Sequence, residues 1–164
     1  QKSKVEKNMN IKKINRLLFW FGLKHIPLLF ICRPKVIVFN EKIMQLKIKL
    51  NWLTKNHLNS MYFGALSIGA DISGGFAAFY FIQKNNYKMS LIFKDFSAQF
   101  LKRAEEDVIF VCNQVDDIKR FIEKTNNSEK RNNMTVIISA FPKSEINHEA
   151  VAEFKLTLSV KKIT

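Results

Sequence analysis

The sequence predicts an α+β fold in which one antiparallel sheet packs around a single long helix. Two observations lead to this prediction. Residues 61–81 (MYFGALSIGADISGGFAAFYF) are long enough for a helix, and apolar residues would lie on almost all of its faces. Such a helix must be buried on every side. Several other segments alternate apolar and polar residues, as strands with one buried face do. A sheet with a helix against one face is an α+β layer arrangement.

The size of the chain fits one compact unit. A length of 164 residues is typical of a single domain, and a hydrophobic content of 47% is enough to build a core. We divide the chain into an N-terminal extension over residues 1–34, which carries a short helix, and a domain over residues 35–164.

The short helix is expected from Ile14 to about Leu23, where apolar residues crowd together, with its end near Gly22. A loop is expected to follow it. Because the first residue is Gln1, we expect that part of the native N-terminus precedes it.

Residues 17–32 (LLFWFGLKHIPLLFIC) resemble a signal or membrane anchor at first sight. Lys24, His25 and Pro27 interrupt the run, which never reaches the ~20 apolar residues that a spanning helix needs. No small-residue cleavage site follows. We therefore expect a packed amphipathic helix and no stable membrane insertion, with attachment to a membrane surface as the alternative.

The strands are expected on both sides of the long helix. Residues 44–50 alternate strictly, and Asn40-Glu41 is expected to turn a hairpin into them. Residues 117–124 have helical spacing, although a twisted edge strand is the alternative, and 126–133 form a turn. The remaining strands are expected over residues 90–102, 108–115, 134–141 and 150–161. A sheet curled around one helix leaves its edge strands unpaired, which favours a homodimer or a tetramer of dimers.

Charge and cysteines limit the partners. The 27 Lys and Arg exceed the 14 Asp and Glu by 13, which favours polyanionic partners. The lysines are dispersed along the chain, so we expect no nucleic acid among these partners.

Cys32 and Cys112 lack the spacing of a metal site or redox pair and are expected to be reduced, buried thiols of a cytoplasmic protein. We expect no metal and no cofactor.

Asp71 is the candidate for chemistry because it lies in the middle of the apolar helix, where a carboxylate is rarely buried without a partner. It is interpreted as a general base or nucleophile in a cleft, against the alternative of a wet stripe on the helix. Gly64 lies seven residues earlier on nearly the same face. The amides of Phe63 and Gly64 would be free donors at the helix start, suited to an oxyanion. Ser67 is placed to hydrogen-bond the Asp71 carboxylate or to act as a small packing residue.

The run from Asn56 to Asp71 (NHLNSMYFGALSIGAD) resembles the signature of the hotdog-fold acyl-CoA thioesterases. The resemblance extends over about residues 35–162, through LIFKDFSAQFLKRAEEDVIFVC and AEFKLTLSVKK. It is strongest to an uncharacterised thioesterase-like branch, the domain of unknown function 4442 type. It implies a hotdog fold and hydrolysis of a fatty or aryl acyl-CoA, with coenzyme A present only as part of the substrate.

The same resemblance assigns roles to individual residues. Asp71 falls at the catalytic acid and Asn56 at the upstream polar residue that orients the carbonyl or the water. Phe63 stands at a family glycine whose amide polarises the thioester, beside Gly64, and Tyr62 stands where many members have His. Phe63 and Tyr62 are thus two departures from the family signature. Tyr donates a hydrogen bond but is a poor base at neutral pH.

Three basic residues are further candidates for substrate binding. Lys102 and Arg103 occupy a turn where the resemblance places the coenzyme A nucleotide, and both side chains suit phosphate. Lys94 shares the alternation of Phe96, Ala98 and Phe100. It either pairs with a carboxylate or ligand phosphate, or lies outside the site because the strand bulges there.

Two functions follow from the sequence, and nucleic-acid or membrane binding driven by the net charge of +13 is kept as a third alternative. The first is an acyl-CoA thioesterase that uses Asp71 and receives the acyl chain in a phenylalanine-rich interior. The second is a non-catalytic protein that binds acyl-CoA or an acyl carrier on the same scaffold, since a fold does not fix a function.

Overall fold

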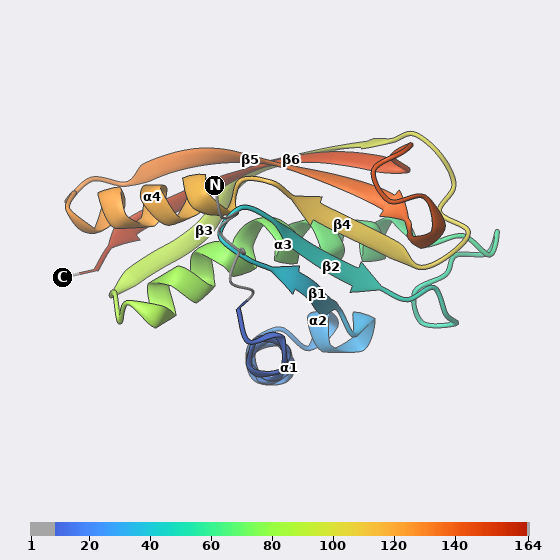
Figure 1. The fold of residues 1–164 in the computed structure, drawn as a ribbon, viewed down its shortest axis with the longest axis horizontal. Helices are drawn as coiled ribbons and strands as arrows, with labels where there is room; N and C mark the ends of the chain where they lie inside the picture. The colour runs from blue at the N-terminus through green and yellow to red at the C-terminus, as the bar shows by residue number, and fades with distance from the viewer. Residues whose placement is uncertain (1–8, 164) are drawn as a thin grey trace, which may run out of the picture.

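The computed structural model describes residues 9–163, which form one six-stranded antiparallel sheet with helices on its concave side (Figure 1). The order of the strands across the sheet is β1-β2-β4-β5-β6-β3. The strands are β1 (Lys35–Phe39), β2 (Met44–Ile48), β3 (Met89–Phe100), β4 (Val108–Cys112), β5 (Asn132–Pro142) and β6 (Ala152–Lys162). The α-helices are α1 (Ile11–His25), α2 (Pro27–Cys32), α3 (Phe63–Lys84) and α4 (Val115–Asn126). A short 3₁₀ turn, η1 (Lys143–Glu145), links β5 to β6.

The predicted central helix is confirmed as α3, which lies across the concave face of the sheet (Figure 1). It is long and apolar enough to cross a membrane, yet 72% of its apolar window is buried inside the fold. Because that surface packs on the sheet, α3 is a core helix. At Gly69 the approach is so close that a Cβ would lie 2.2 Å from Cζ of Phe110 on β4. Glycine is therefore required at this position by the ring that covers it.

The helical alternative for residues 117–124 is the correct one, and the edge-strand alternative is wrong. This segment belongs to α4, which lies beside α3 and buries Val115, Ile118 and Ile122. Asp116 and Asp117 in its first turn both pair with Arg120. Acidic residues at the start of a helix stabilise it through the helix dipole.

The N-terminal extension differs from the prediction in two ways. The helix does not end near Gly22 but continues to His25, and the expected loop is a second short helix, α2. Gly22 is buried, and a Cβ there would lie 3.2 Å from the backbone nitrogen of Phe30, so this glycine permits the close packing of α2 on α1. The turn between the helices lies at Pro27, which disfavours helical geometry in the preceding residue and is well suited to begin the next helix.

The extension is attached along β1. The amide side chain of Asn15 donates to the carbonyl of Val36 at 2.8 Å and accepts from its N–H at 2.8 Å. Met9 donates its N–H to the carbonyl of Phe39 at 2.9 Å. The pair of helices thus closes one side of the half-open sheet, the side on which β1 is the edge strand (Figure 1).

The predicted hairpin is confirmed. The side-chain oxygen of Asn40 accepts from the N–H groups of Lys42 and Ile43, both at 2.9 Å, and this closes the turn between β1 and β2. The predicted strands after the long helix are confirmed as β3, β4, β5 and β6 to within a few residues at each end. Cys32 and Cys112 are buried and free, as predicted.

We expect Gly69→Ala to destabilise the protein by about 1–3 kcal/mol, because the added methyl group must displace the buried Phe110 ring. Gly74→Ala is the matched control on the same helix. A Cβ at Gly74 meets no atom closer than 3.4 Å, an ordinary contact with Leu156, and alanine is the better helix former by ~1 kcal/mol. Urea unfolding of the two variants should therefore give shifts of opposite sign. Equal shifts would show that the contact at Gly69 does not constrain the packing.

Candidate active site

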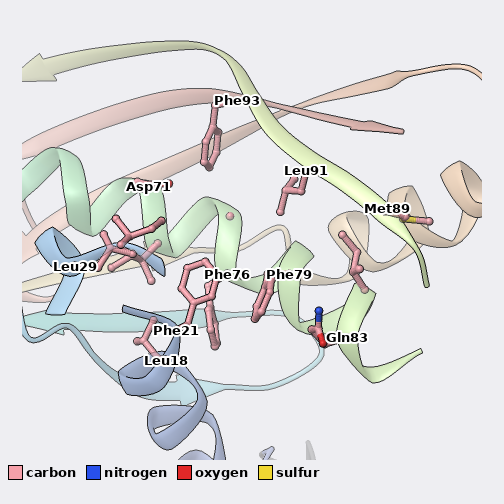
Figure 2. Close-up of a pocket in the computed structure, with 14 residues that line it drawn as sticks. Leu18, Phe21, Leu29, Asp71, Phe76, Phe79, Gln83, Met89, Leu91 and Phe93 are labelled. Atoms are coloured by element: carbon pink, nitrogen blue, oxygen red, sulfur yellow. The ribbon is translucent and has the colours of Figure 1, made fainter. Parts of the chain in front are cut away.

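A cavity of about 450 Å³ lies between α3, the N-terminal helices and β3 (Figure 2). Its wall is almost entirely apolar, and among the described residues Asp71 is the one charged residue in it. The N-terminal helices and the turn between them contribute Leu18, Phe21, Ile26 and Leu29; α3 contributes Asp71, Ile72, Gly75, Phe76, Phe79, Ile82 and Gln83; β3 contributes Met89, Leu91 and Phe93. A pocket of this size and lining suits a small ligand with an apolar body.

Asp71 is held in a desolvated position. Burial raises the pKa of its carboxyl from 3.8 to about 6, because an apolar environment disfavours the charged form. Within residues 9–163 no side chain hydrogen-bonds the carboxylate or pairs with it. A carboxyl group with a raised pKa beside a cavity is a candidate general base, because its proton affinity is closer to neutral pH.

Phe93 and Gly75 lie close to the carboxylate of Asp71. A Cβ on Gly75 would lie 2.8 Å from Cζ of Phe93 and 3.8 Å from Oδ1 of Asp71. The ring of Phe93 thus points from β3 onto α3 one turn after Asp71, as Figure 2 shows. Neither residue stood out in the sequence as part of the site, although the spacing of Gly75 from Asp71 places it on the same helix face.

A β-bulge at Lys94 sets the direction of the Phe93 side chain. Phe93 pairs with Leu158 and Asp95 pairs with Thr157, so Lys94 is the extra residue. The bulge allows both Phe93 and Phe96 to face the helix although they are three positions apart. The bulge that was one alternative for Lys94 is present, and the Lys94 side chain is exposed. Contact of Lys94 with a ligand phosphate stays a prediction.

The start of α3 presents backbone donors. Tyr62 occupies the N-cap position, but no side chain caps the helix, so the first-turn N–H groups, those of Phe63 and Gly64 among them, have no partner within the helix. The preceding loop is fixed by two hydrogen bonds, from Met61 N–H to the Ala104 carbonyl at 2.7 Å and from Tyr62 N–H to the Thr54 carbonyl at 2.8 Å. Phe63 precedes Asp71 by eight residues, about 12 Å along the helix axis.

Aromatic side chains surround this helix start. The ring of Phe63 is 57% exposed and lies 4.6 Å from the ring of Tyr62 and 6.2 Å from that of Phe100, measured between centroids. A Cβ at Gly64 would lie 2.4 Å from Cε1 of Tyr62. The tyrosine ring therefore folds over Gly64.

The other two polar candidates on this side are bonded within their own segments. The side-chain oxygen of Asn56 accepts from the N–H groups of Leu58 at 2.9 Å and Ser60 at 3.2 Å. The hydroxyl of Ser67 donates to the Phe63 carbonyl at 2.9 Å and not to Asp71.

Lys102 and Arg103 follow the end of β3, beyond Phe100, and are exposed. They lie toward the start of α3, because β3 runs back along α3 from the helix end. Lys102 forms an ion pair with Glu149. Exposed pairs of this kind contribute little to stability and exchange readily for another anion.

Comparison with solved structures places the fold. A probable thioesterase from Pseudomonas aeruginosa superposes with a TM-score of 0.75 at 17% identity, over 96% of this chain and 99% of that one. A thioesterase from Haemophilus influenzae gives a TM-score of 0.69 at 14% identity, over 96% and 94% of the two chains. A protein of unknown function from Chlorobaculum tepidum gives 0.79 at 11% identity, over 93% and 97%. This chain has the hotdog fold.

The hotdog fold is thus confirmed through structure and not through sequence. No family model matches the chain, and no curated protein matches it. The structural neighbours belong to the thioesterase superfamily, while assignment to the domain 4442 branch stays a prediction.

We expect Asp71→Asn to stabilise the protein at pH 7–8 by about 2–3 kcal/mol. The pKa of the Asp71 carboxyl is about 6 in the folded state and 3.8 in the unfolded state. Its burial therefore lowers the free energy of unfolding at pH values above 6, whereas at pH values below 3.8 it has no such effect. The gain should therefore shrink as the pH falls from 6 to 4. Unfolding in urea across this range is the measurement, with Glu123→Gln, an exposed acid, as control. A gain that is independent of pH would contradict the desolvated state of Asp71.

Proposed function

We propose that this protein hydrolyses an acyl-CoA thioester, with a fatty or aryl acyl group bound in the cavity between α1, α3 and β3. The observation that carries the proposal is a carboxyl with a raised pKa in the wall of an apolar cavity, on the central helix of a hotdog fold. Thioesterase neighbours support the reaction class.

The arrangement of the elements supports one direction of binding. The cavity extends from Asp71 past Phe76 and Phe79 to Gln83, toward the end of α3, and is the place for an apolar acyl chain. The helix start, with its free amides and exposed aromatic rings, lies on the other side of Asp71. The thioester carbonyl would lie between the two. Coenzyme A would then extend toward Lys102 and Arg103, whose charges suit its phosphates.

The chemical step requires only residues of this chain and water. As general base, the Asp71 carboxylate takes a proton from a water molecule while that oxygen attacks the thioester carbonyl carbon. The carbonyl oxygen gains negative charge, which the N–H groups of Phe63 and Gly64 would stabilise. When the tetrahedral intermediate collapses, the carbon–sulfur bond breaks and the coenzyme A thiolate leaves and is protonated. In the alternative step Asp71 attacks directly, and water hydrolyses the resulting anhydride.

The edge strand supports a homodimer. Within residues 9–163, β3 pairs with β6 alone along its twelve residues, so its other edge presents backbone groups that no described strand pairs. Ile92, Phe96 and Phe100 are large exposed apolar residues on the same strand. Pairing of β3 with a second copy would satisfy these backbone groups and cover part of the exposed side chains. We place the dimer, or a tetramer of dimers, in the cytoplasm.

Non-catalytic binding of acyl-CoA or of an acyl carrier is the second candidate. It is favoured by one specific observation, the Phe63 ring at the helix start where the acyl thioester would approach. Asn56 and Ser67, two of the predicted polar groups, are also engaged by their own backbone.

The decisive experiment is hydrolysis of a panel of acyl-CoAs of different chain length by the wild-type protein and by Asp71→Asn. We expect at least a 100-fold loss of kcat in the variant, since the amide cannot accept the proton. The wild-type kcat/KM should rise with pH through about 6, where Asp71 ionises. Asp117→Asn, an exposed acid on α4, is the control. Acyl-CoA binding without turnover at any chain length would favour the second candidate.

For the dimer, we expect a mass of two chains by light scattering after size exclusion, and a monomer for Ile92→Lys. Ile92 is half-exposed on the edge strand, so the substitution should leave the folded monomer intact while it places charge in the interface. Ile137→Lys, equally exposed on the interior strand β5, is the matched control and should remain dimeric. A monomeric wild-type protein would contradict this assembly.

A further inference from the structure

The N-terminal helices present large apolar side chains to solvent. Phe19, Trp20 and Leu23 on α1, Ile26 in the turn, and Leu28 and Ile31 on α2 are all exposed, with Trp20 at 49% and Leu28 at 58%. We call these six residues the N-terminal apolar patch. Exposed apolar residues scattered singly are ordinary, but six on two adjoining helices mark an interaction surface.

On α1 these side chains share one face with basic residues. At 100° per residue, the exposed positions from Lys12 to Lys24 fall within an arc of about 140°. The opposite face holds Ile14, Leu18 and Gly22, which are buried against the domain. The helix is therefore already packed on one side, and its outward face carries aromatic and basic residues together.

The charge around the patch is of one sign. Between Glu6 and Glu41 the sequence has seven Lys or Arg and no Asp or Glu. Lys12, Lys13, Arg16, Lys24 and Arg33 are exposed on α1 and just after α2, and the Lys24 ammonium lies 5.6 Å from the centre of the Trp20 ring. On α4, by contrast, Asp116 and Asp117 accompany Arg120.

The combination of exposed apolar side chains and positive charge indicates which kind of partner binds the N-terminal apolar patch. A second copy of the chain would bring the same positive charges together, which is unfavourable. Nucleic acid would satisfy the charges but leave the apolar side chains without a counterpart. An anionic bilayer surface satisfies both, since phosphate headgroups meet Lys and Arg while Trp, Phe and Leu enter the boundary with the acyl chains. Tryptophan is enriched at that depth.

We propose that α1 and α2 bind the protein to the surface of an anionic membrane, with the N-terminal apolar patch inserted to the headgroup boundary. The bound state is peripheral, because the patch is a surface of a folded domain and not a spanning segment. It also bears on the cavity. Ile26 belongs to the patch and lines the cavity, while Phe21, Leu18 and Leu29 line it from the inner side of the same helices. Docking would therefore bring one wall of the cavity to the membrane.

The test uses the whole chain and large unilamellar vesicles of phosphatidylcholine with or without 30% phosphatidylglycerol. We expect co-sedimentation with the anionic vesicles at least 10-fold stronger than with phosphatidylcholine alone, and weaker at high salt. Trp20 supplies a second readout. In a Trp52→Phe background its fluorescence should shift to the blue on binding, whereas Trp52, exposed in the Trp20→Phe protein, should not respond.

Two variants separate the contributions of charge and apolar surface. Lys12→Gln/Lys13→Gln/Arg16→Gln and Trp20→Ser/Leu28→Ser should each weaken binding at least 10-fold. Because these side chains point to solvent, the unfolding midpoints should stay close to wild type. The control is Lys130→Gln/Lys155→Gln/Lys161→Gln, which removes equal charge elsewhere on the exposed surface and should bind within about 2-fold of wild type.

Three outcomes would overturn the proposal: no binding of the wild-type chain to anionic vesicles, equal binding to both vesicle types, or an equal loss in the control triple variant. The last would show that binding follows net charge and not the patch. Acyl-CoA hydrolysis in detergent-free buffer is measured in parallel. The patch variants should retain it, so that failure of membrane binding and failure of the proposed enzyme activity are distinguishable.

Discussion

The structure depends on the close approach of α3 to the concave face of the sheet. At Gly69 the Phe110 ring occupies the space of a side chain, and at Gly74 Leu156 is in ordinary contact with the helix. Gly69 and Gly74 thus face the sheet, and close packing of α3 on it follows from that. The larger side chains, Phe76 and Phe79, consequently face the other way and need a cover of their own.

The side chains of α3 that face away from the sheet are covered by different elements on its two sides. On the β1 side, Asn15 completes two backbone hydrogen bonds at the strand edge and holds α1 over the helix. The cavity lies between these N-terminal helices and β3, with Asp71 in its wall. This asymmetry explains why the carboxylate is desolvated enough for burial to raise its pKa to about 6 and yet remains accessible from the cavity.

The sequence predicted those features that depend on periodicity along the chain. The alternation of apolar residues identified the strands, the Asn40 turn followed from its side chain, and the charge in an apolar helix singled out Asp71. Features that depend on contacts between distant segments were not predictable in this way. The sequence left a bulge at Lys94 as one of two alternatives, and it is the pairing of Phe93 with Leu158 and of Asp95 with Thr157 that shows it. The role of Gly22 likewise depends on where Phe30 returns, so a packing glycine was mistaken for a helix end.

The residues of the candidate site also differ in whether the sequence alone could identify them. Asp71 and the helix start were identifiable because they lie on one continuous helix, whereas the cavity is assembled from three separate segments. The N-terminal extension illustrates the consequence. In the sequence, residues 17–32 form one apolar run, but in the fold its side chains point in different directions. Leu18 and Leu29 face the cavity or core, while Trp20 and Leu28 face solvent. α1 and α2 combine a wall of the cavity with an outer face on which basic and aromatic residues are exposed. Under the two proposals made above, the extension links the cavity to a membrane surface.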